Sequence, residues 1–241
     1  MKNQIKINRS KAERFLYTIV LGTLIASVIF IIYRIIQAPV VSDSEAVRTK
    51  SSYTLMLSQC VLGIIAIHIP DIFERRIKYE IPSFMIIMYI IFLYCAIYLG
   101  EVRNFYYQYH NWDALLHTFS GGMLGALGFS VVNLLNNTDE IPMDLSPFFV
   151  ALFAFCFAIT IGVFWEFYEF AFDKILGLNM QKFMLENGTM LVGREALTDT
   201  MMDLVVDAIG AFVMSAIGYI SIKYSGKFIK KIRFIKIEDK Q

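Results

Sequence analysis

The chain has 241 residues, of which 57% are hydrophobic and 18% are charged, and its mean hydropathy is +0.56. This composition excludes an ordinary soluble domain and predicts an integral membrane protein. The formal net charge is only +1, so the overall charge gives no support to a nucleic-acid partner.

Six apolar segments are long enough to cross a hydrocarbon core of about 30 Å. In chain order they cover residues 15–37, 53–72, 82–100, 112–135, 147–172 and 199–222. The first is longer than a signal-peptide core and no small-residue cleavage pattern follows it, so we count it as a span. The sequence therefore predicts an all-α, polytopic bundle of six transmembrane helices (residues 15–222) between two basic tails, 1–14 and 223–241.

The distribution of Lys and Arg predicts the orientation, because cytoplasmic segments retain these residues. With the N-terminus inside, the inner segments contain fifteen Lys and Arg residues and the outer segments contain seven. The inner loop 136–146 contains neither and gives no support of its own. We therefore predict that both termini are cytoplasmic.

Two segments outside the spans have more than one interpretation. Residues 174–198 form a long, partly apolar outer connection, which could be a lid or a surface helix, although a plain surface connector is the simpler interpretation. Residues 227–237 (KFIKKIRFIKI) alternate basic and apolar side chains, as a segment lying on anionic lipid would. An ordinary signal that retains the tail in the cytoplasm explains the second pattern equally well.

Acidic residues recur at helical spacing near the predicted outer ends of the last three spans. The members are Asp113 and His117 in span four, Glu166, Glu169 and Asp173 in span five, and Asp199, Asp203 and Asp207 in span six. An acidic residue near the centre of a span costs roughly 2.5 to 3.5 kcal/mol on insertion scales, so these side chains should face the bundle interior. We expect the three helices to share one acidic site.

Carboxylates that share a pocket cannot all stay ionised without protons or cations beside them. Arg103 and Arg194 could neutralise some of them from the outer loops, but a divalent cation is the more economical counter-charge. Carboxylate oxygens with one imidazole nitrogen suit Mg, Mn, Zn or Fe. The predicted ligands are His117, Asp113, Glu166, Glu169, Asp203 and Asp207.

Several of these residues also have a plainer interpretation. Asp113 and His117 could be a helix cap with its hydrogen-bonded partner, and Glu169 and Asp173 could be solvated at the interface. Asp199 is most simply an N-cap, and we interpret it so. The remaining acids, Glu166, Asp203 and Asp207, lie within spans. An ionisable residue inside the membrane usually has a function, so we favour a functional role for these three.

Small residues follow the acids in spans four and six. Gly121 and Gly125 have GxxxG spacing, and Ala211 and Ser215 lie on one seam of the last span. Small side chains allow close helix approach, so we expect these two helices to pack tightly.

The region from about residue 100 to 212 resembles the YjdF-type family of uncharacterised bacterial inner-membrane proteins and, more distantly, the VanZ-like membrane proteins. The residues that carry the resemblance are Glu101, Asp113 and His117 followed by Phe119 and Gly121, Glu166 and Glu169 beside an aromatic, and Asp203 and Asp207 ahead of Gly210 and Ala211. The resemblance implies a multi-pass protein of the bacterial plasma membrane with these positions as signature residues. It implies no established activity.

Three functions are compatible with this pattern. The first is a metal-dependent hydrolase that acts on a lipid-linked, envelope or small-molecule substrate at the outer face, with membrane lipid as its surroundings and no nucleic-acid partner. The second is a cation- or proton-coupled transporter, although a carrier would be expected to show a midplane site, broken helices or repeats, and the sequence shows none of these signs. The third is a structural or accessory role. Ser120 lies near His117, but a serine protease would need its base on another helix.

Overall fold

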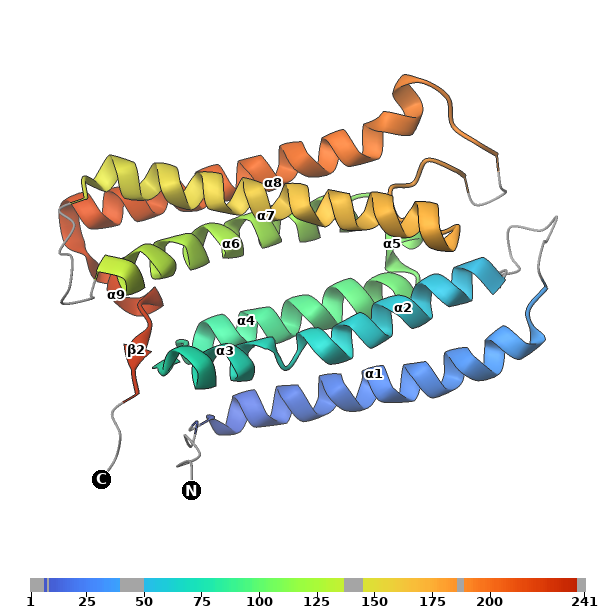
Figure 1. Ribbon diagram of the computed structural model, residues 1–241, viewed down its shortest axis with the longest axis horizontal. Helices are drawn as coiled ribbons and strands as arrows, with labels where there is room; N and C mark the ends of the chain where they lie inside the picture. The colour runs from blue at the N-terminus through green and yellow to red at the C-terminus, as the bar shows by residue number, and fades with distance from the viewer. Residues whose placement is uncertain (1–6, 8, 40–49, 137–144, 186–188, 238–241) are drawn as a thin grey trace.

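The computed structural model describes residues 7, 9–39, 50–136, 145–185 and 189–237. Half of the predicted N-terminal tail, most of the inner loop 136–146 and the last four residues of the C-terminal tail lie outside these residues. Six helical segments long and apolar enough to span a membrane run side by side along the molecule (Figure 1). The predicted six-span, all-α fold is confirmed.

The elements follow the six predicted spans in chain order. They are α1 (Lys11–Gln37), α2 (Lys50–Ala66), α3 (Ile69–Ile77), β1 (Tyr79–Glu80), α4 (Ser83–Leu93), the π-helix η1 (Tyr94–Val102), α5 (Phe105–Gln108), α6 (Trp112–Asn136), α7 (Pro147–Leu176), α8 (Arg194–Ile220), the π-helix η2 (Ser221–Ser225), α9 (Lys227–Ile232) and β2 (Ile235–Lys236).

Capping residues fix the ends of α1 and α7, and both helices extend beyond the apolar runs that predicted them, α1 at its start and α7 at its end. α1 begins at Lys11 because Ser10 and Glu13 form a capping box, in which each side chain accepts a hydrogen bond from the other residue's backbone N–H. α7 begins after Ser146, whose side chain caps the helix, and ends at Gly177 in the left-handed conformation. Hydropathy alone does not predict helix ends that are set by capping residues.

Three of the spans are not continuous α-helices within the described residues. The second span is interrupted between α2 and α3, just before Pro70, which has no N–H to continue the helical hydrogen bonds. The third span changes from α4 to the π-helix η1, which ends beside Glu101. The sixth span changes from α8 to the π-helix η2 at Ser221. We predicted no broken helix, and these interruptions show that the prediction was wrong.

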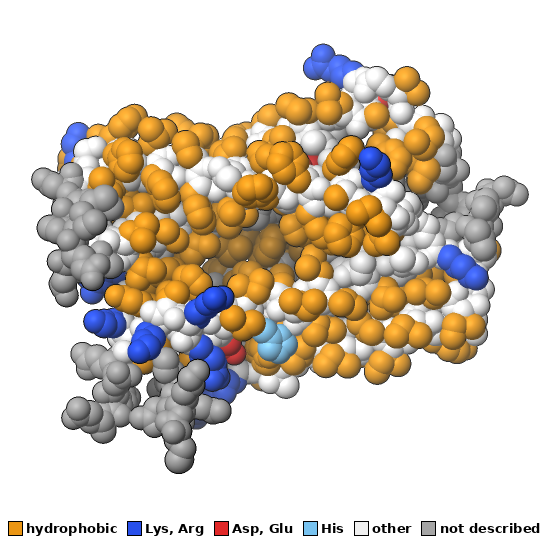
Figure 2. Space-filling view, viewed as in Figure 1, with side chains coloured by type: hydrophobic (Ala, Val, Ile, Leu, Met, Phe, Trp, Pro, Cys, Tyr) orange, Lys and Arg blue, Asp and Glu red, His pale blue; other side chains and the backbone are white. Residues whose placement is uncertain are grey.

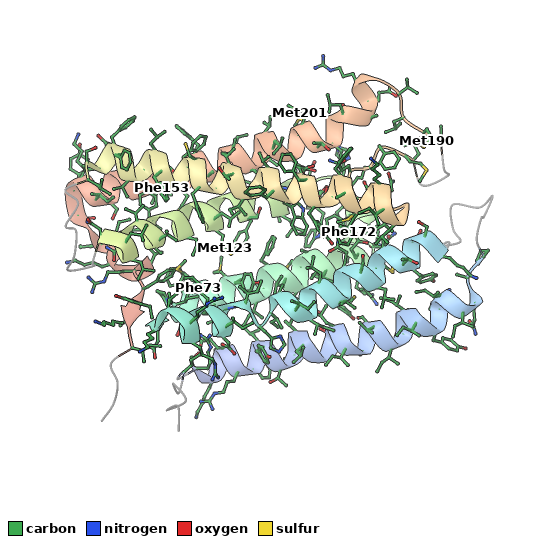
Figure 3. The ribbon with its side chains drawn as sticks, viewed as in Figure 1. Phe73, Met123, Phe153, Phe172, Met190 and Met201 are labelled. Atoms are coloured by element: carbon green, nitrogen blue, oxygen red, sulfur yellow. The ribbon has the colours of Figure 1, made fainter. Side chains whose placement is uncertain are left out.

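The spans form two groups of three. One core joins α1, α2, α4 and η1, and a second core lies mainly between α6, α7 and α9. Between the groups the surface is hollowed and lined by hydrophobic side chains (Figure 2), and Met123 of α6 lies in this region (Figure 3). Within the second group, α6 and α8 pack most extensively.

Both ends of the chain reach the same end of the bundle, as an even number of spans requires (Figure 1). β2 pairs antiparallel with β1 there. Ile232 and Phe234 of the basic tail are buried, and Ser130 Oγ donates a hydrogen bond to the carbonyl of Ile232 at 2.8 Å. Ile232 and Phe234 therefore pack on the bundle and are not available to lipid, whereas Ile235 is exposed. The packing of these two residues differs from the interpretation of the whole segment as lying on lipid.

Candidate metal centre

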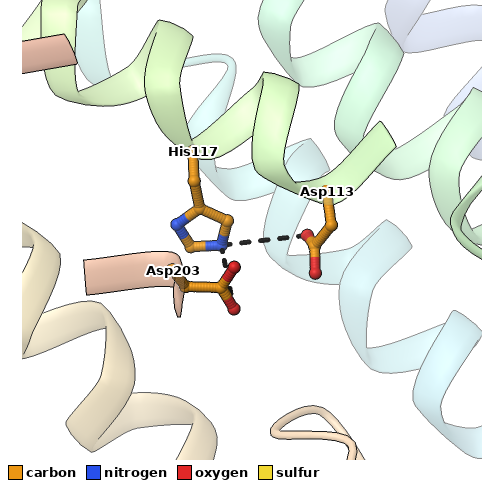
Figure 4. A group of neighbouring side chains, drawn as sticks. All are labelled: Asp113, His117 and Asp203. Atoms are coloured by element: carbon orange, nitrogen blue, oxygen red, sulfur yellow. Dashed lines mark ion pairs between the residues drawn. The ribbon is translucent and has the colours of Figure 1, made fainter. Parts of the chain in front are cut away.

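The first turns of α6 place an aspartate and a histidine on one helix face, at the end of the bundle far from the termini. Nε2 of His117 lies 3.8 Å from Oδ1 of Asp113 and 3.8 Å from Oδ2 of Asp203, which α8 contributes (Figure 4). One ligand atom from each of these side chains lies within 4.8 Å of the other two. The structure thus brings three of the predicted ligands together.

Asp207 holds the other nitrogen of the same imidazole ring. Its Oδ2 lies 3.3 Å from Nδ1 of His117, and its Oδ1 accepts a hydrogen bond from Ser120 Oγ at 3.1 Å. An ionised carboxylate can only accept, so Nδ1 is assigned the proton in this bond. In the neutral ring, Nε2 then presents its lone pair toward Asp113 and Asp203.

Glycines bring the backbones of α6 and α8 together at the level of this site. A Cβ on Gly121 would lie 2.3 Å from the carbonyl oxygen of Asp207, and a Cβ on Gly210 would lie 2.0 Å from that of Thr118. Both positions therefore exclude any side chain larger than hydrogen. The predicted tight packing of these helices is confirmed, and it is what lets Asp207 reach the imidazole.

α7 contributes two buried glutamates. Oε2 of Glu166 accepts a hydrogen bond from Gln181 Nε2 at 3.1 Å, whereas Oε1 is buried and has no hydrogen-bond partner among the described residues. Glu169 accepts a hydrogen bond from Trp165 Nε1 at 2.8 Å and lies close enough to Glu166 to repel it. Because Glu169 is only 8% exposed, its interpretation as a solvated surface residue is wrong.

The connection between α7 and α8 inserts into this end of the bundle. Asp173, near the end of α7, accepts hydrogen bonds from the backbone N–H groups of Met180 and Gln181 at 2.7 and 3.0 Å. The side chains of Leu178 and Met180 are buried. The interpretations of residues 174–198 as a plain surface connector, and of Asp173 as a solvated residue, are therefore wrong.

This connection also contributes a cationic side chain, Lys182, which we did not predict to be part of the site. The ammonium of Lys182 contacts Asp113 and lies 3.0 Å from Oδ1 of Asp199. Burial alone would lower the pKa of Lys182, but the two carboxylates outweigh it and raise the pKa above its ordinary value. The arginines considered for this role, Arg103 and Arg194, are both exposed.

Asp199 is not a helix cap. α8 begins at Arg194, after Gly193 in a positive-φ conformation, so Asp199 lies inside the helix. One carboxylate oxygen contacts Lys182, and the other is buried with no hydrogen-bond partner among the described residues. The predicted N-cap is therefore wrong, and Asp199 belongs to the acidic cluster.

Negative charge exceeds positive charge at this end of the bundle. The carboxyl groups of the cluster are those of Asp113, Glu166, Glu169, Asp199, Asp203 and Asp207. The described residues that contact them supply one ammonium, from Lys182, and one imidazole, from His117. Six carboxyl groups cannot all remain ionised against these two groups. The cluster therefore has a capacity for protons or for a further cation.

Comparison with known proteins agrees with the architecture. The chain is 29% identical over 166 residues to an uncharacterised protein of Thermotoga maritima, an alignment that covers 68% of this chain and 76% of the relative. No solved structure shows significant similarity to the chain. A family model described as "Predicted membrane protein (DUF2238)" matches residues 18–224, which run from within the first span almost to the end of the sixth and include the acidic cluster. The chain belongs to this family of membrane proteins.

Proposed function

We propose that Asp113, His117 and Asp203 form a divalent-cation centre that supports hydrolysis of a lipid or envelope substrate. The observation that carries the proposal is the position of the imidazole. Asp207 fixes Nδ1 of His117, while Nε2 lies 3.8 Å from an oxygen of each of the other two aspartates. A carboxylate on the far nitrogen is the usual support of a histidine that binds a metal.

The spacing of the donor atoms fits such an ion. Ligands about 2.0 to 2.2 Å from a metal can be at most about 4.4 Å apart. Nε2 of His117 meets this limit with both aspartate oxygens, and the largest separation in the group, up to 4.8 Å, needs only a small contraction. Oxygen and imidazole donors favour Mg, Mn, Zn or Fe.

The other acidic residues have different parts in this proposal. Asp207 positions His117, and Glu166 is the best placed base, because its Oε1 is buried and no described residue donates to it. Glu169, buried three residues after Glu166 on α7, is held by the hydrogen bond from Trp165 and is a candidate for a further ligand. A bound divalent cation would generate a nucleophilic water and stabilise charge on a phosphoryl or acyl oxygen.

Lys182 opposes a metal ion at this site through its charge. Its ammonium contacts Oδ2 of Asp113, whereas Oδ1 is the oxygen that lies 3.8 Å from His117, so the lysine reduces the negative charge available to the metal without occupying that oxygen. The ammonium therefore acts as a counter-charge in the metal-free site and as a competitor for the incoming ion. It also ties the segment that contains Met180 and Gln181 to α6. A bound metal ion and the Lys182 ammonium repel each other, so each weakens the binding of the other in the proposal.

The location supports a substrate at the membrane surface. The site lies at the end of a membrane-spanning bundle, far from the two termini. With the predicted cytoplasmic termini, that end faces outward from the bacterial plasma membrane, which also agrees with the YjdF-type resemblance. The substrate class we propose is therefore a lipid, a lipid-linked compound or another envelope component.

Metal analysis of purified protein tests the proposal. We expect wild-type protein to retain a stoichiometric divalent cation by elemental analysis, and the Asp203→Asn/Asp207→Asn double variant to lose it. Glu195→Gln is the matched control, since Glu195 is an exposed acid in the first turn of the same helix. Equal metal content in wild type and the double variant would remove the centre as proposed.

A cation- or proton-coupled carrier is the second candidate. It is favoured by the interruptions of the second and third spans, the latter where α4 changes to the π-helix η1 that contains Glu101. Lipid extracts from deletion and overexpression strains should be compared alongside cation uptake by vesicles. Changed uptake with an unchanged lipid profile would favour the carrier, and the reverse would favour the hydrolase.

A further inference from the structure

A cavity with polar and apolar walls lies at the opposite end of the bundle from the acidic cluster. Its volume is about 300 Å³, at the lower end of the range for ligand pockets. Polar residues at the start of α1 line one part of it, and apolar residues of α4, including Ile86 and Ile90, line another. The cavity is therefore amphipathic, with a charged part and a hydrocarbon part.

The charged wall is fixed by an arginine fork. Arg9 donates to Oδ1 of Asp71 at 3.2 and 2.5 Å, and to the two oxygens of Glu74 at 3.2 and 2.6 Å. Glu74 is fully buried and also accepts a hydrogen bond from the backbone N–H of Ile81 at 2.7 Å. These bonds hold the residues before α1 against α3, so the cavity is preformed.

Glu13 has an unused hydrogen-bond acceptor in this wall. Its side chain lines the cavity although the residue is only 2% exposed. Oε2 accepts the backbone N–H of Ser10 at 2.7 Å, whereas Oε1 is buried with no partner among the described residues. A buried acceptor without a donor is unfavourable, so a ligand with N–H groups would be stabilised here.

Arg14 supplies the complementary charge. It also lines the cavity, one residue after Glu13, and it is exposed. A guanidinium suits a phosphate because its N–H donors match two phosphate oxygens. The cavity thus combines an acceptor for an ammonium, a donor for a phosphate and an apolar surface within one membrane-embedded site.

We propose that this cavity binds a phospholipid whose head group carries a primary ammonium, of the phosphatidylethanolamine type. The ammonium donates to Oε1 of Glu13, the phosphate contacts Arg14, and an acyl chain lies along Ile86 and Ile90. A choline head group has the same charge and phosphate but no N–H, so it cannot satisfy Glu13.

Wild-type protein provides the first test. Apparent affinities would be measured by native mass spectrometry for dioleoyl phosphatidylethanolamine, its N-methyl and N,N-dimethyl derivatives, and the phosphatidylcholine. We expect affinity to fall along this series, by about tenfold between the first and the last, as donors are removed. Equal affinity for all four lipids would overturn the proposal. Glycerophosphoethanolamine, which lacks acyl chains, should bind at least tenfold more weakly than the lipid, and equal binding would overturn the lipid as the ligand.

Variants then separate the two ends of the head group. Glu13→Gln keeps an acceptor for Ser10, and should abolish the preference for phosphatidylethanolamine over phosphatidylcholine. Arg14→Gln should weaken both lipids to a similar extent, because the phosphate is common to them. Arg75→Gln, at an exposed arginine of the same end that does not line the cavity, should change neither. An unchanged preference in Glu13→Gln, or an effect of Arg75→Gln as large as that of Arg14→Gln, would contradict the assignment.

Discussion

Lys182 and His117 contact different but overlapping sets of aspartates in the acidic cluster. Lys182 contacts Asp113 and Asp199, whereas His117 lies beside Asp113 and the two deeper aspartates of α8. Helical spacing was sufficient to predict the histidine and the aspartates, because the polar residues of each span recur on one face of that helix. It gave no sign of Lys182, which reaches the site only through the path of a connection between helices.

Removal of this lysine should strengthen metal binding. In Lys182→Met the competing ammonium is lost, so we expect the affinity for a divalent cation to rise about tenfold, or about 1.4 kcal/mol. Titration calorimetry of the purified protein would measure the change. Lys174→Met, which removes an exposed lysine near the end of α7, is the control and should leave the affinity unchanged. A weaker affinity in Lys182→Met would show that the lysine supports the metal instead of competing with it.

The raised pKa of Lys182 has a consequence at alkaline pH. A lysine stabilised as its ammonium stays protonated when the pH passes the ordinary value of about 10.4. The ion pairs therefore contribute fully below that value and are lost only as the pH rises through the higher pKa of the folded protein. At pH about 10, Lys182 should react more slowly with an amine-acetylating reagent than exposed Lys174, as measured by mass spectrometry of peptides. Equal reaction rates would contradict the ion pairs.

At the scale of elements, apolar run length predicted the spans and failed at their interruptions. The hydropathy of an apolar run does not depend on whether its backbone hydrogen bonds follow the α or the π pattern. The sequence therefore did not predict η1. The break before Pro70 did have a signal, because proline cannot continue the helical hydrogen bonds. The acidic cluster depends on a different feature, the glycine contact between α6 and α8.

The close contact between α6 and α8 predicts that alanine substitution is much more destabilising at Gly210 than at Gly22. In Gly210→Ala the new Cβ would meet the carbonyl oxygen of Thr118, so α8 must move away from α6. We expect a loss on the order of 1 to 3 kcal/mol in stability, the usual cost of overpacking, together with weaker metal binding. Thermal unfolding followed by tryptophan fluorescence would report the first change.

Gly22→Ala is the matched control for this substitution. Gly22 lies in α1, and nothing is within 4 Å of the position its Cβ would take. Its replacement should be neutral or stabilise by up to about 1 kcal/mol, through helix propensity. Similar losses of stability in the two variants would mean that the glycine contact does not hold these helices together.

Over the whole molecule, the division of charge between the two ends predicts how the bundle lies in the membrane. The end with the termini holds the basic C-terminal residues and the arginine fork, whereas the other end holds the acidic cluster. Composition was enough to predict six spans, but the sequence could not show that two groups of three helices leave an apolar hollow between them (Figure 2). Such a shape depends on side-chain packing between helices that are distant in the chain.

Cysteine accessibility would establish the orientation. The three native cysteines, Cys60, Cys95 and Cys156, would first be replaced by alanine or serine. A single cysteine at Val192, which is 80% exposed near the acidic cluster, should then react with a membrane-impermeant maleimide in intact cells. A single cysteine at exposed Arg75, at the other end, should react only after lysis.

This outcome follows from the retention of Lys and Arg in the cytoplasm, since the predicted inner segments contain fifteen of these residues against seven outside. The reverse labelling pattern would place the acidic cluster on the cytoplasmic side. The cation centre could still exist there, because its donor atoms do not depend on the orientation. A substrate outside the cell would then be excluded, since no outer-face compound could reach His117 without crossing the membrane.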